Sequence, residues 1–341
     1  MSNRRDNGWS RREFLQRLSL AGTGAFLGLR SDGIAAEPPL ETRKIKLVHR
    51  TDAICMSPQY VAEELLRVEG FTEVEYLKTI GGSGIEKALA SGDAHLSMHM
   101  VASYIARLEV GDPIVIIGGG HVGCYELFAS TRVRTIRDLK GKAVATTGLG
   151  STPHIFLAIM AAYVGLDPRK DINWVRRDAS EQVQLLAEGK IDAFLAFPPT
   201  AQELRQKKIG HVVVNSMMDK PWSQYFCCVV AGNREFVRRN PGATKRALRA
   251  ILKSADACAR EPDRFASLLV DKGFAQNYDY ALQTMKDMHY GQWRDYDPED
   301  TVRFFSLRLH EIGVIKSSPQ KIIAQGTDWR FLKELKKELK G

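Results

Sequence analysis

The feature of the chain that most constrains its fold is an internal repeat with an offset of 95 residues. One helical pattern begins at Ser57-Pro58 and ends at Gly70-Phe71, and a second begins at Thr152-Pro153 and ends at Gly165-Leu166. Each pattern has an N-cap hydroxyl, a proline at the first helical position and a glycine just past the end, which together predict a complete helix. The sequence therefore predicts that one structural unit occurs twice.

Each repeated helix is followed by the same succession of elements. A short strand, a second helix and a closing strand are expected in both units. The strands are expected at 74–77 and 94–98 in the first unit and at 172–175 and 191–197 in the second, and the second helices end at 89–92 and 186–189. Alternating strands and helices are typical of a parallel sheet covered by helices, so the fold class is α/β.

Apolar segments between and after the units predict how the two are joined. Residues 113–117 and 124–130 carry the chain from the first unit to the second, and residues 225–231 form a further strand after the second. Two crossing strands favour two lobes joined by a hinge, with a cleft between them. One continuous doubly wound sheet is the alternative.

Loops at the ends of the expected strands are the candidate binding surface. Ligands in α/β proteins bind at the carboxyl ends of strands, where the free N–H groups of helix N-termini favour anionic or polar groups. These loops are 51–58, 79–84 and 99–103 in the first unit and 147–152, 178–180 and 197–200 in the second. Six loops from two lobes indicate a binding cleft.

The first 36 residues have the pattern of an export signal. Ser10-Arg11-Arg12-Glu13-Phe14-Leu15 pairs two arginines with two large apolar residues, as twin-arginine signals do. The apolar stretch 18–29 would span roughly 18 Å as a helix, too short for a bilayer core of about 30 Å. Small residues at 33–36 predict cleavage near Ala36, and hence a periplasmic mature protein. An amphipathic helix that stays on the chain is the alternative.

Charge argues against a nucleic-acid partner. The full chain has a formal charge of +9, and the segment 1–36 carries six basic and three acidic residues, so its removal leaves +6. The remaining basic residues form no arginine-rich stripe interleaved with aromatics. We expect no nucleic-acid partner and a monomeric protein, and the modest positive balance fits a binder of anions.

Catalytic and cofactor motifs are weak or missing. The run 118–123 formally matches the dinucleotide fingerprint, but three consecutive glycines satisfy it easily and no helix-length segment follows. Gly141-Lys142 is followed by Ala143, which excludes a P-loop, and the chain has no G-x-S-x-G elbow. We therefore expect no catalytic residue and no cofactor.

Histidine and cysteine spacing predicts no metal site. His95 and His99 would lie about 13 Å apart on a strand and could not share one ion, and a copper site at Met98-His99-Met100 is a minor alternative. The five cysteines (Cys55, Cys124, Cys227, Cys228 and Cys258) lack the even spacing of a disulfide scaffold. The neighbours Cys227 and Cys228 would pair only with strain, and we expect buried thiols.

Several short motifs together resemble one family. They are Gly81-Gly82-Ser83-Gly84, Leu89–Asp93, Asp138–Lys142, Gly148–His154 with Gly165-Leu166, Leu186–Phe194, and Cys228–Asn233 before Phe236. In about residues 44 to 270 the chain resembles the solute-binding proteins of ABC importers of the nitrate/sulfonate/taurine (NitT/TauT-type) family, which includes binders of thiamine-pyrimidine precursors. Related eukaryotic pyrimidine synthases carry a cysteine-rich cluster, whereas only Cys227-Cys228 stands here, which argues against their chemistry.

The resemblance implies a two-lobed periplasmic-binding-protein fold of the type II, Venus-flytrap kind, with two hinge crossovers. Lobe 1 would comprise 42–131 and 229–341, and lobe 2 would comprise 132–228. The implied function is capture of a small organic anion, or a polar aromatic or heterocyclic compound, and its delivery to a membrane permease of an ABC transporter. An enzyme on the same fold and a periplasmic ligand sensor are the alternatives.

The resemblance also implies which residues face the cleft. Ligand contacts in the family come from the loops at the strand ends. The implied ligand-binding residues are Ser57, Gly82, Ser83, His99, Met100, Ser151, Thr152, His154, Asp178, Phe197 and Pro198, with His121 and Tyr225 beside the hinge.

Overall fold

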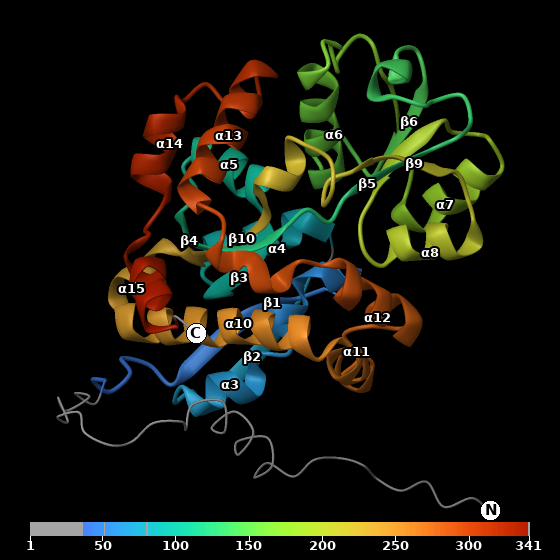
Figure 1. Ribbon diagram of the computed structural model, residues 1–341. Helices are drawn as coiled ribbons and strands as arrows, with labels where there is room; N and C mark the ends of the chain where they lie inside the picture. The colour runs from blue at the N-terminus through green and yellow to red at the C-terminus, as the bar shows by residue number, and fades with distance from the viewer. Residues whose placement is uncertain (1–36, 51, 80, 340–341) are drawn as a thin grey trace, which may run out of the picture. The chain divides into compact units, whose positions relative to one another are not determined.

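The computed structural model describes residues 37–50, 52–79 and 81–339 (Figure 1). The chain divides into two units, and the second, which begins at Leu40, holds every helix and strand discussed below. The expected export signal, residues 1–36, lies outside the described residues. Of the helices in the described part, none is both long and apolar enough to cross a membrane.

Two five-stranded sheets organise the unit from residue 40 onward. The first has the order β2-β1-β3-β10-β4 and the second the order β7-β6-β8-β5-β9. The strands of the first sheet are β1 (Lys44–His49), β2 (Glu73–Lys78), β3 (Leu96–Met100), β4 (Ile114–Val122) and β10 (Phe226–Asn233). Those of the second are β5 (Glu126–Ala129), β6 (Ala143–Thr146), β7 (Asn173–Arg176), β8 (Ala193–Ala196) and β9 (His211–Asn215).

The internal repeat is confirmed in the strand pairing. In the first sheet β1 runs parallel to β2 and β3, and in the second β6 runs parallel to β7 and β8. Each sheet is then extended by two strands in antiparallel pairing, through β10 in the first and β5 in the second. Two sheets with the same strand order mean two lobes, so the alternative of one continuous sheet is wrong.

The repeated helix differs between the two lobes. In the second lobe the predicted helix is present as α6, which spans Thr152–Tyr163, but its N-cap is Ser151 and not Thr152. In the first lobe, a short 3-10 turn η1 (Ile54–Met56) leads into α2 (Ser57–Tyr60), and the chain then breaks before α3 (Glu63–Val68). The buried amide of Gln59 explains the break, because it donates to the Val48 carbonyl at 2.9 Å and accepts from the Met98 amide at 2.6 Å. These contacts tie α2 to the sheet, while α3 lies on the surface.

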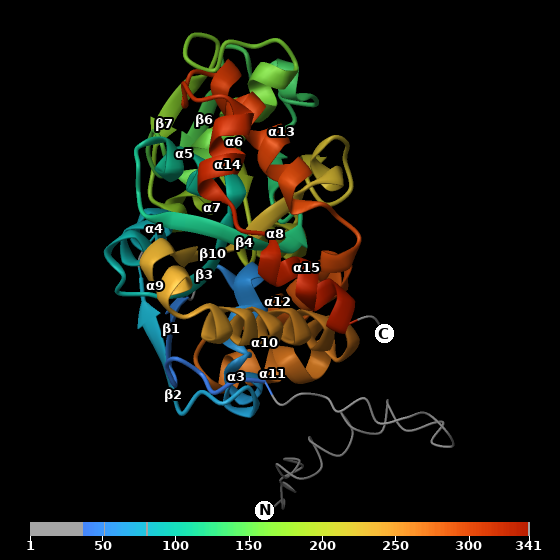
Figure 2. The ribbon, with the colours of Figure 1, turned by 90° about the vertical axis from the view of Figure 1, so that its left-hand side faces the viewer.

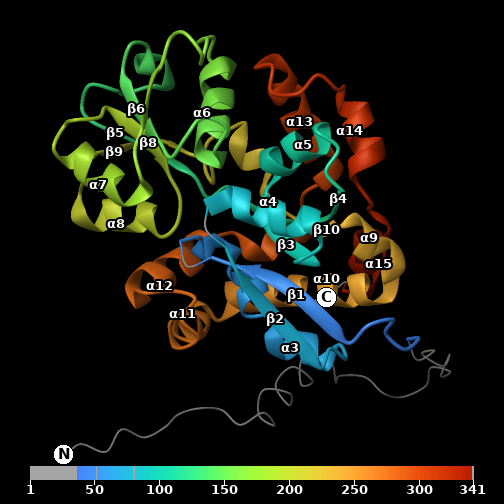
Figure 3. The same cartoon turned by 180° about the vertical axis from the view of Figure 1, so that it is seen from behind.

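Helices cover both sheets. In the first lobe, α4 (Gly81–Ser91) and α5 (Val101–Glu109) lie on one side of the sheet, and Figure 2 shows α10 (Pro241–Arg260) below β10 and β3. Figure 3 shows β1 and β2 side by side above α3. The remaining helices are α7 (Ala179–Ala187), α8 (Thr200–Lys207), α9 (Arg234–Arg239), α11 (Pro262–Asp271), α12 (Tyr278–Asp287), α13 (Pro298–Glu311), α14 (Pro319–Gly326) and α15 (Arg330–Glu338).

Two crossovers join the sheets. The first crossover, residues 123–125, leads from β4 to β5, and the second, residues 216–225, leads from β9 to β10. The sequence-based lobe boundaries at 131/132 and 228/229 fall a few residues after these crossings. The reason is that β5 pairs with β8 and β9, so it belongs to the second sheet, while β10 already begins at Phe226.

One buried apolar cluster extends through both lobes, and a smaller second cluster lies under α7 and α8. Helix α13 continues the larger cluster, since the Phe305 ring lies 5.8 Å from the Phe156 ring on α6. The fully buried aromatic rings Tyr60, Tyr290 and Trp293 lie within it on the first-lobe side. The lobes are therefore joined by shared packing as well as by the two crossovers.

Candidate ligand-binding site

Polar side chains of the two lobes meet where β3 ends and α6 begins. The Ser103 and Thr152 hydroxyl oxygens lie 2.9 Å apart, and His99 Nε2 lies 3.5 Å from the same Thr152 oxygen. His99 Nε2 also lies 3.4 Å from the Glu86 carboxylate on α4. We call this set of residues, Glu86, His99, Ser103 and Thr152, the interlobe cluster. His99 is 4 % exposed and Thr152 is 8 % exposed, so the cluster is almost fully covered.

The N-terminus of α6 supplies further polar groups on the second-lobe side. Ser151 is the N-cap residue, and its hydroxyl lies 3.0 Å from the Thr146 hydroxyl at the end of β6. The preceding Gly150 has φ +81° and its N–H donates to His154 Nδ1 at 3.1 Å. Because the first N–H groups of a helix have no partner within the helix and carry its positive dipole end, this terminus favours an anionic group.

The structure brings together only part of the predicted set of residues. His99, Ser151 and Thr152 lie at the junction of the lobes, and Met100 is buried beside them at the end of β3. Phe197 lies at the end of β8, with its ring 5.4 Å from the Tyr125 ring, and Pro198 follows it.

Other predicted residues have local structural roles. The Ser57 hydroxyl donates to the Ile54 carbonyl, and Asp178 forms a capping box with Glu181 at the start of α7. The Tyr225 ring stacks on Phe304 with 4.0 Å between ring centroids. The His154 ring lies against Trp174, and burial lowers the pKa of His154.

The glycine-rich segment 79–84 is not a loop as predicted. Gly82 and Ser83 lie in the first turn of α4, which begins at Gly81. Gly81, the first residue of α4, has φ +66°, a conformation that costs glycine little. The backbone N–H groups of this turn therefore belong to a helix N-terminus.

Sequence analysis missed a buried arginine at the end of β1. The Arg50 side chain is 7 % exposed, and its Nε donates to Asp52 at 2.9 Å. The loop considered from the sequence began at residue 51, one position too late, because β1 ends at His49. Arg50 is a cation at the carboxyl end of a strand, where a ligand anion is expected.

A buried thiol and imidazole cluster lies at the crossovers. Cys55, His121, Cys124 and Cys228 place one ligand atom each within 4.8 Å of one another, and all four residues are buried. Burial acts to lower the pKa of His121, but charge interactions and hydrogen bonds with Cys228 and Cys55 prevail and raise it to about 10. Spacing gave no signal for this set, because the residues come from three separate segments that only the fold brings together.

The two described pockets lie away from the interlobe cluster. One of about 360 Å³ lies between α8 and α12, and one of about 540 Å³ lies beside the second crossover. Gln202, Arg205, Gln206, Asp279, Tyr280 and Gln283 line the first; Met217, Met218, Lys220, Ser223, Gln224, His289, Gln292 and Tyr296 line the second. Neither lining includes a predicted site residue. The segment 99–103 is not a loop as predicted, because β3 runs directly into α5 at Val101, and Ser103 on α5 touches Thr152 at the start of α6.

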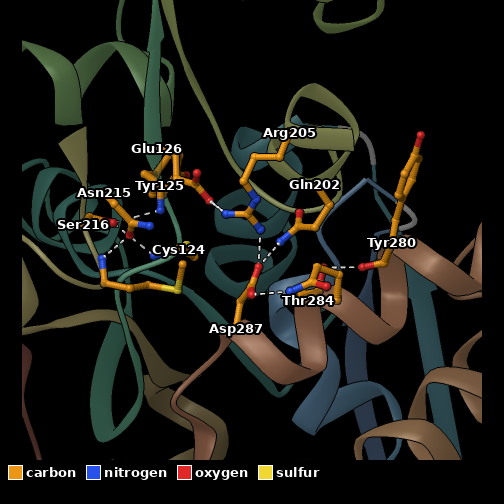
Figure 4. A network of polar contacts seen from close by, with 12 residues as sticks. Cys124, Tyr125, Glu126, Gln202, Arg205, Asn215, Ser216, Tyr280, Thr284 and Asp287 are labelled. Carbon is orange, nitrogen blue, oxygen red and sulfur yellow. Dashed lines mark hydrogen bonds and ion pairs between the residues drawn. The ribbon is translucent and has the colours of Figure 1, made fainter. Parts of the chain in front are cut away.

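An ion-pair network beside the first pocket also joins the lobes (Figure 4). Arg205 on α8 pairs both with Glu126 on β5 and with Asp287 at the end of α12, a first-lobe helix. Asp287 also accepts from Gln202 at 3.2 Å and from Gln283 at 2.7 Å. Burial raises the pKa of Glu126, and the Arg205 guanidinium opposes that rise. We call Glu126, Arg205 and Asp287 the interlobe ion-pair network.

Two α/β lobes with equivalent strand orders, two crossovers and polar strand ends at the junction define a two-lobed periplasmic-binding-protein fold. The nitrate-binding protein NrtA from Synechocystis PCC 6803 has a similar structure, with a TM-score of 0.74, 14 % identity, 89 % of this chain covered and 90 % of that one. The alkanesulfonate-binding protein SsuA from Xanthomonas axonopodis pv. citri, bound to MOPS, has a TM-score of 0.67 and 15 % identity, with 85 % of this chain and 100 % of that one covered. A DSZB variant bound to biphenyl-2-sulfinic acid has a TM-score of 0.61 and 13 % identity, with 86 % of this chain and 99 % of that one covered.

A family match over residues 58–265, more than half of the chain, is to the model described as NMT1/THI5 like. The chain therefore belongs to the NMT1/THI5-like family. The resemblance to NitT/TauT-type solute-binding proteins is confirmed by this match together with the nitrate- and sulfonate-binding structural neighbours. A search of curated protein sequences gave no match.

Proposed function

We propose that this chain is the extracytoplasmic solute-binding component of an ABC importer and captures a small organic anion, or a polar aromatic or heterocyclic acid, between its lobes. The observation that carries the proposal is the convergence of His99 and Ser103 from one lobe with Thr152 and the α6 N-terminus from the other. Ionisable and hydroxyl groups at such a junction contact a solute only when both lobes close on it. NrtA and SsuA, named for nitrate and alkanesulfonate binding, support an anionic solute.

The proposed mechanism is recognition without turnover. An open form admits the solute, closure buries it between the lobes, and a membrane permease reads the closed form. The solute has to bind the closed form more tightly than the open form, since equal affinity would shift no population. The interlobe cluster supports this part of the proposal, because its residues come from different lobes.

The proposal includes the location and the assembly of the protein. The pattern of residues 1–36 supports export through the twin-arginine pathway with cleavage near Ala36, and the periplasmic names of the structural neighbours agree with that compartment. We propose a monomer that works with the permease and has no nucleic-acid partner. Of the groups described above, Arg50 is the cation at the first-lobe strand ends, and an anionic solute would compete with its ion-pair partner Asp52 for it.

An enzyme on the same fold is the second candidate function. The DSZB variant bound to an organic sulfinate and the buried cluster of Cys55, His121, Cys124 and Cys228 favour it. All four side chains are buried, so a solute between the lobes would have to displace protein atoms to reach a thiol. We therefore propose that the chain is not an enzyme. Conversion of any bound compound to a product would show instead that it is one.

Calorimetric titration of the protein with sulfonates, nitrate, aromatic acids and pyrimidines tests the proposed function. We expect saturable heat at one site per chain from at least one of these classes. His99→Gln is expected to lower the affinity for that compound about tenfold, because one hydrogen bond to a charged partner is lost.

His95→Gln is the matched control, because His95 lies four positions away on the same segment and stacks on Phe236 at 4.0 Å instead of facing the second lobe. The control should keep the wild-type affinity. Equal weakening by both variants would remove the interlobe cluster from the proposed site, and no heat with any class would overturn the function.

A further inference from the structure

The four residues of the thiol and imidazole cluster come together where the crossovers meet the first lobe. Cys55 lies in η1 of the first lobe and His121 near the end of β4. Cys124 lies in the first crossover, and Cys228 lies in β10 just after the second. Their four ligand atoms lie within 4.8 Å of one another, and each residue is at most 4 % exposed.

The hydrogen bonding of His121 gives an independent indication of a ligand. Its Nδ1 lies 3.0 Å from the Gly123 carbonyl oxygen, which fixes that nitrogen as the N–H donor. Its Nε2 is buried and has no hydrogen-bond partner among the residues that the structure describes. Metal-binding histidines show this arrangement, in which one ring nitrogen donates to a carbonyl and the other offers its lone pair to the ion.

The donor set and its size fit one particular ion. Three thiolates and one imidazole form a closed tetrahedral zinc site, with Zn–S bonds of about 2.3 Å and sulfur atoms about 3.8 Å apart. The ligand atoms here, within 4.8 Å of one another, reach that geometry by an inward movement of about 1 Å. We propose that Cys55, His121, Cys124 and Cys228 bind one zinc ion, which ties the first crossover to η1, β4 and β10 of the first lobe.

The proposed zinc ion has a structural role. All four coordination positions belong to the protein, so no position remains for water or substrate, unlike in catalytic zinc sites. Binding releases to solvent the protons that the three thiol groups and His121 Nε2 carry, because only thiolates and an unprotonated imidazole nitrogen coordinate the ion. The ion would hold the first crossover against the first part of β10, so that closure bends the chain on the second-lobe side of the ion.

A disulfide between Cys124 and Cys227 is the competing arrangement. Their sulfur atoms lie 3.3 Å apart, and a disulfide requires about 2.05 Å. That bond would remove Cys124 from the cluster and leave the Nε2 of His121 without a partner. The zinc site uses this nitrogen and three of the four neighbouring thiols, and it leaves Cys227 as a buried free thiol.

The test measures metal content and coordination in the full chain, purified without chelator. Elemental analysis should give one zinc per chain, and cobalt exchanged into the protein should show the absorption of tetrahedral cobalt with thiolate ligands. Cys55→Ser should lower the zinc content at least tenfold. Cys258→Ser is the matched control, because Cys258 is an equally buried thiol on α10 outside the cluster, and it should retain one zinc.

Removal of zinc should also lower the melting temperature by about 5 °C or more, since an ion bound only by the folded state stabilises it. The cobalt spectrum of the unmodified chain keeps the test valid even where a variant fails to fold. One equivalent of another metal on these ligands would overturn the assignment of zinc. So would a metal-free protein, or one whose mass shows the loss of two hydrogens in a Cys124–Cys227 disulfide.

Discussion

Replacing Gly123 by alanine is expected to destabilise the folded protein by about 3 kcal/mol. The cost of a left-handed backbone conformation adds to the steric overlap of the new Cβ with neighbouring backbone atoms. Gly123 lies in the first crossover with φ +50°, and a Cβ placed there would lie 2.5 Å from both Cα and N of Met217 in the second crossover. Neither backbone has room to move, since the Ser216 hydroxyl accepts hydrogen bonds from the Cys124 and Tyr125 amides at 3.1 and 2.9 Å (Figure 4). The free energy of unfolding, measured with urea, checks this loss.

Gly291→Ala is the matched control for this prediction. Gly291 lies in the 3-10 turn η4 (Tyr290–Arg294), and its added Cβ would meet only the Ala259 methyl group, at 3.6 Å, an ordinary contact. We expect a change of about 0.5 kcal/mol or less. If the two variants had the same stability, the two crossovers would not be in backbone contact as described.

Arg205→Met is the second substitution with a large expected effect. It leaves the Glu126 carboxylate, 1 % exposed, without its counter-charge, and removing one partner of a buried ion pair costs about 3 kcal/mol. Since Arg205 itself is 31 % exposed, solvent moderates the loss, and we expect about 2 kcal/mol at pH 8. Lys207→Met on the same helix is the control, because Lys207 pairs with Glu203 at the surface and its loss should leave the stability close to that of the unmodified chain.

The pH dependence of the Arg205→Met effect has a definite sign. Burial already raises the pKa of Glu126, and loss of the guanidinium raises it further. A carboxyl group whose pKa is higher in the folded than in the unfolded chain lowers the free energy of unfolding once the pH exceeds its pKa in the unfolded chain. Above that pH the unfolded chain ionises the group freely, whereas the folded chain has to bury the charge. The destabilisation should therefore be smaller at pH 5 than at pH 8. An effect independent of pH would contradict the assigned role of Glu126.

Asp287→Asn separates the two halves of the interlobe ion-pair network. It leaves the Glu126–Arg205 pair within the second lobe and weakens the contacts from Arg205 and Gln202 on α8 to the first lobe. Stability should change little, while the open form gains population and the affinity for the solute falls. This difference from Arg205→Met would assign the cross-lobe half of the network to closure.

Local signals in the sequence were sufficient for the architecture because the same signals occur twice. Proline at a helix start, glycine at a helix end and short apolar runs are local, and they predicted α6, β2 and β7 with small errors at their ends. The break after Tyr60 was missed because it depends on Gln59, whose amide contacts β1 and β3 from other parts of the chain. The antiparallel addition of β5 and β10 is likewise a tertiary contact with no local signal.

For the site, the sequence predicted the strand-end loops but not the partners within them. His99, Ser151 and Thr152 were predicted from their places after strands, and these residues do lie at the junction of the lobes. The Arg205–Asp287 contact joins residues 82 positions apart, and the cysteine cluster joins three separate segments. Such sets are fixed only when the lobes pack, so neither spacing nor composition indicated them.

Small-angle X-ray scattering of the protein with and without its bound solute tests the central claim, capture by closure of two lobes, most directly. The solute is the compound that gives the tightest calorimetric binding in the panel of sulfonates, nitrate, aromatic acids and pyrimidines. We predict that saturation with this compound lowers the radius of gyration, and that Asp287→Asn requires more of it for the same decrease. Bound solute with an unchanged radius of gyration would contradict capture between the lobes.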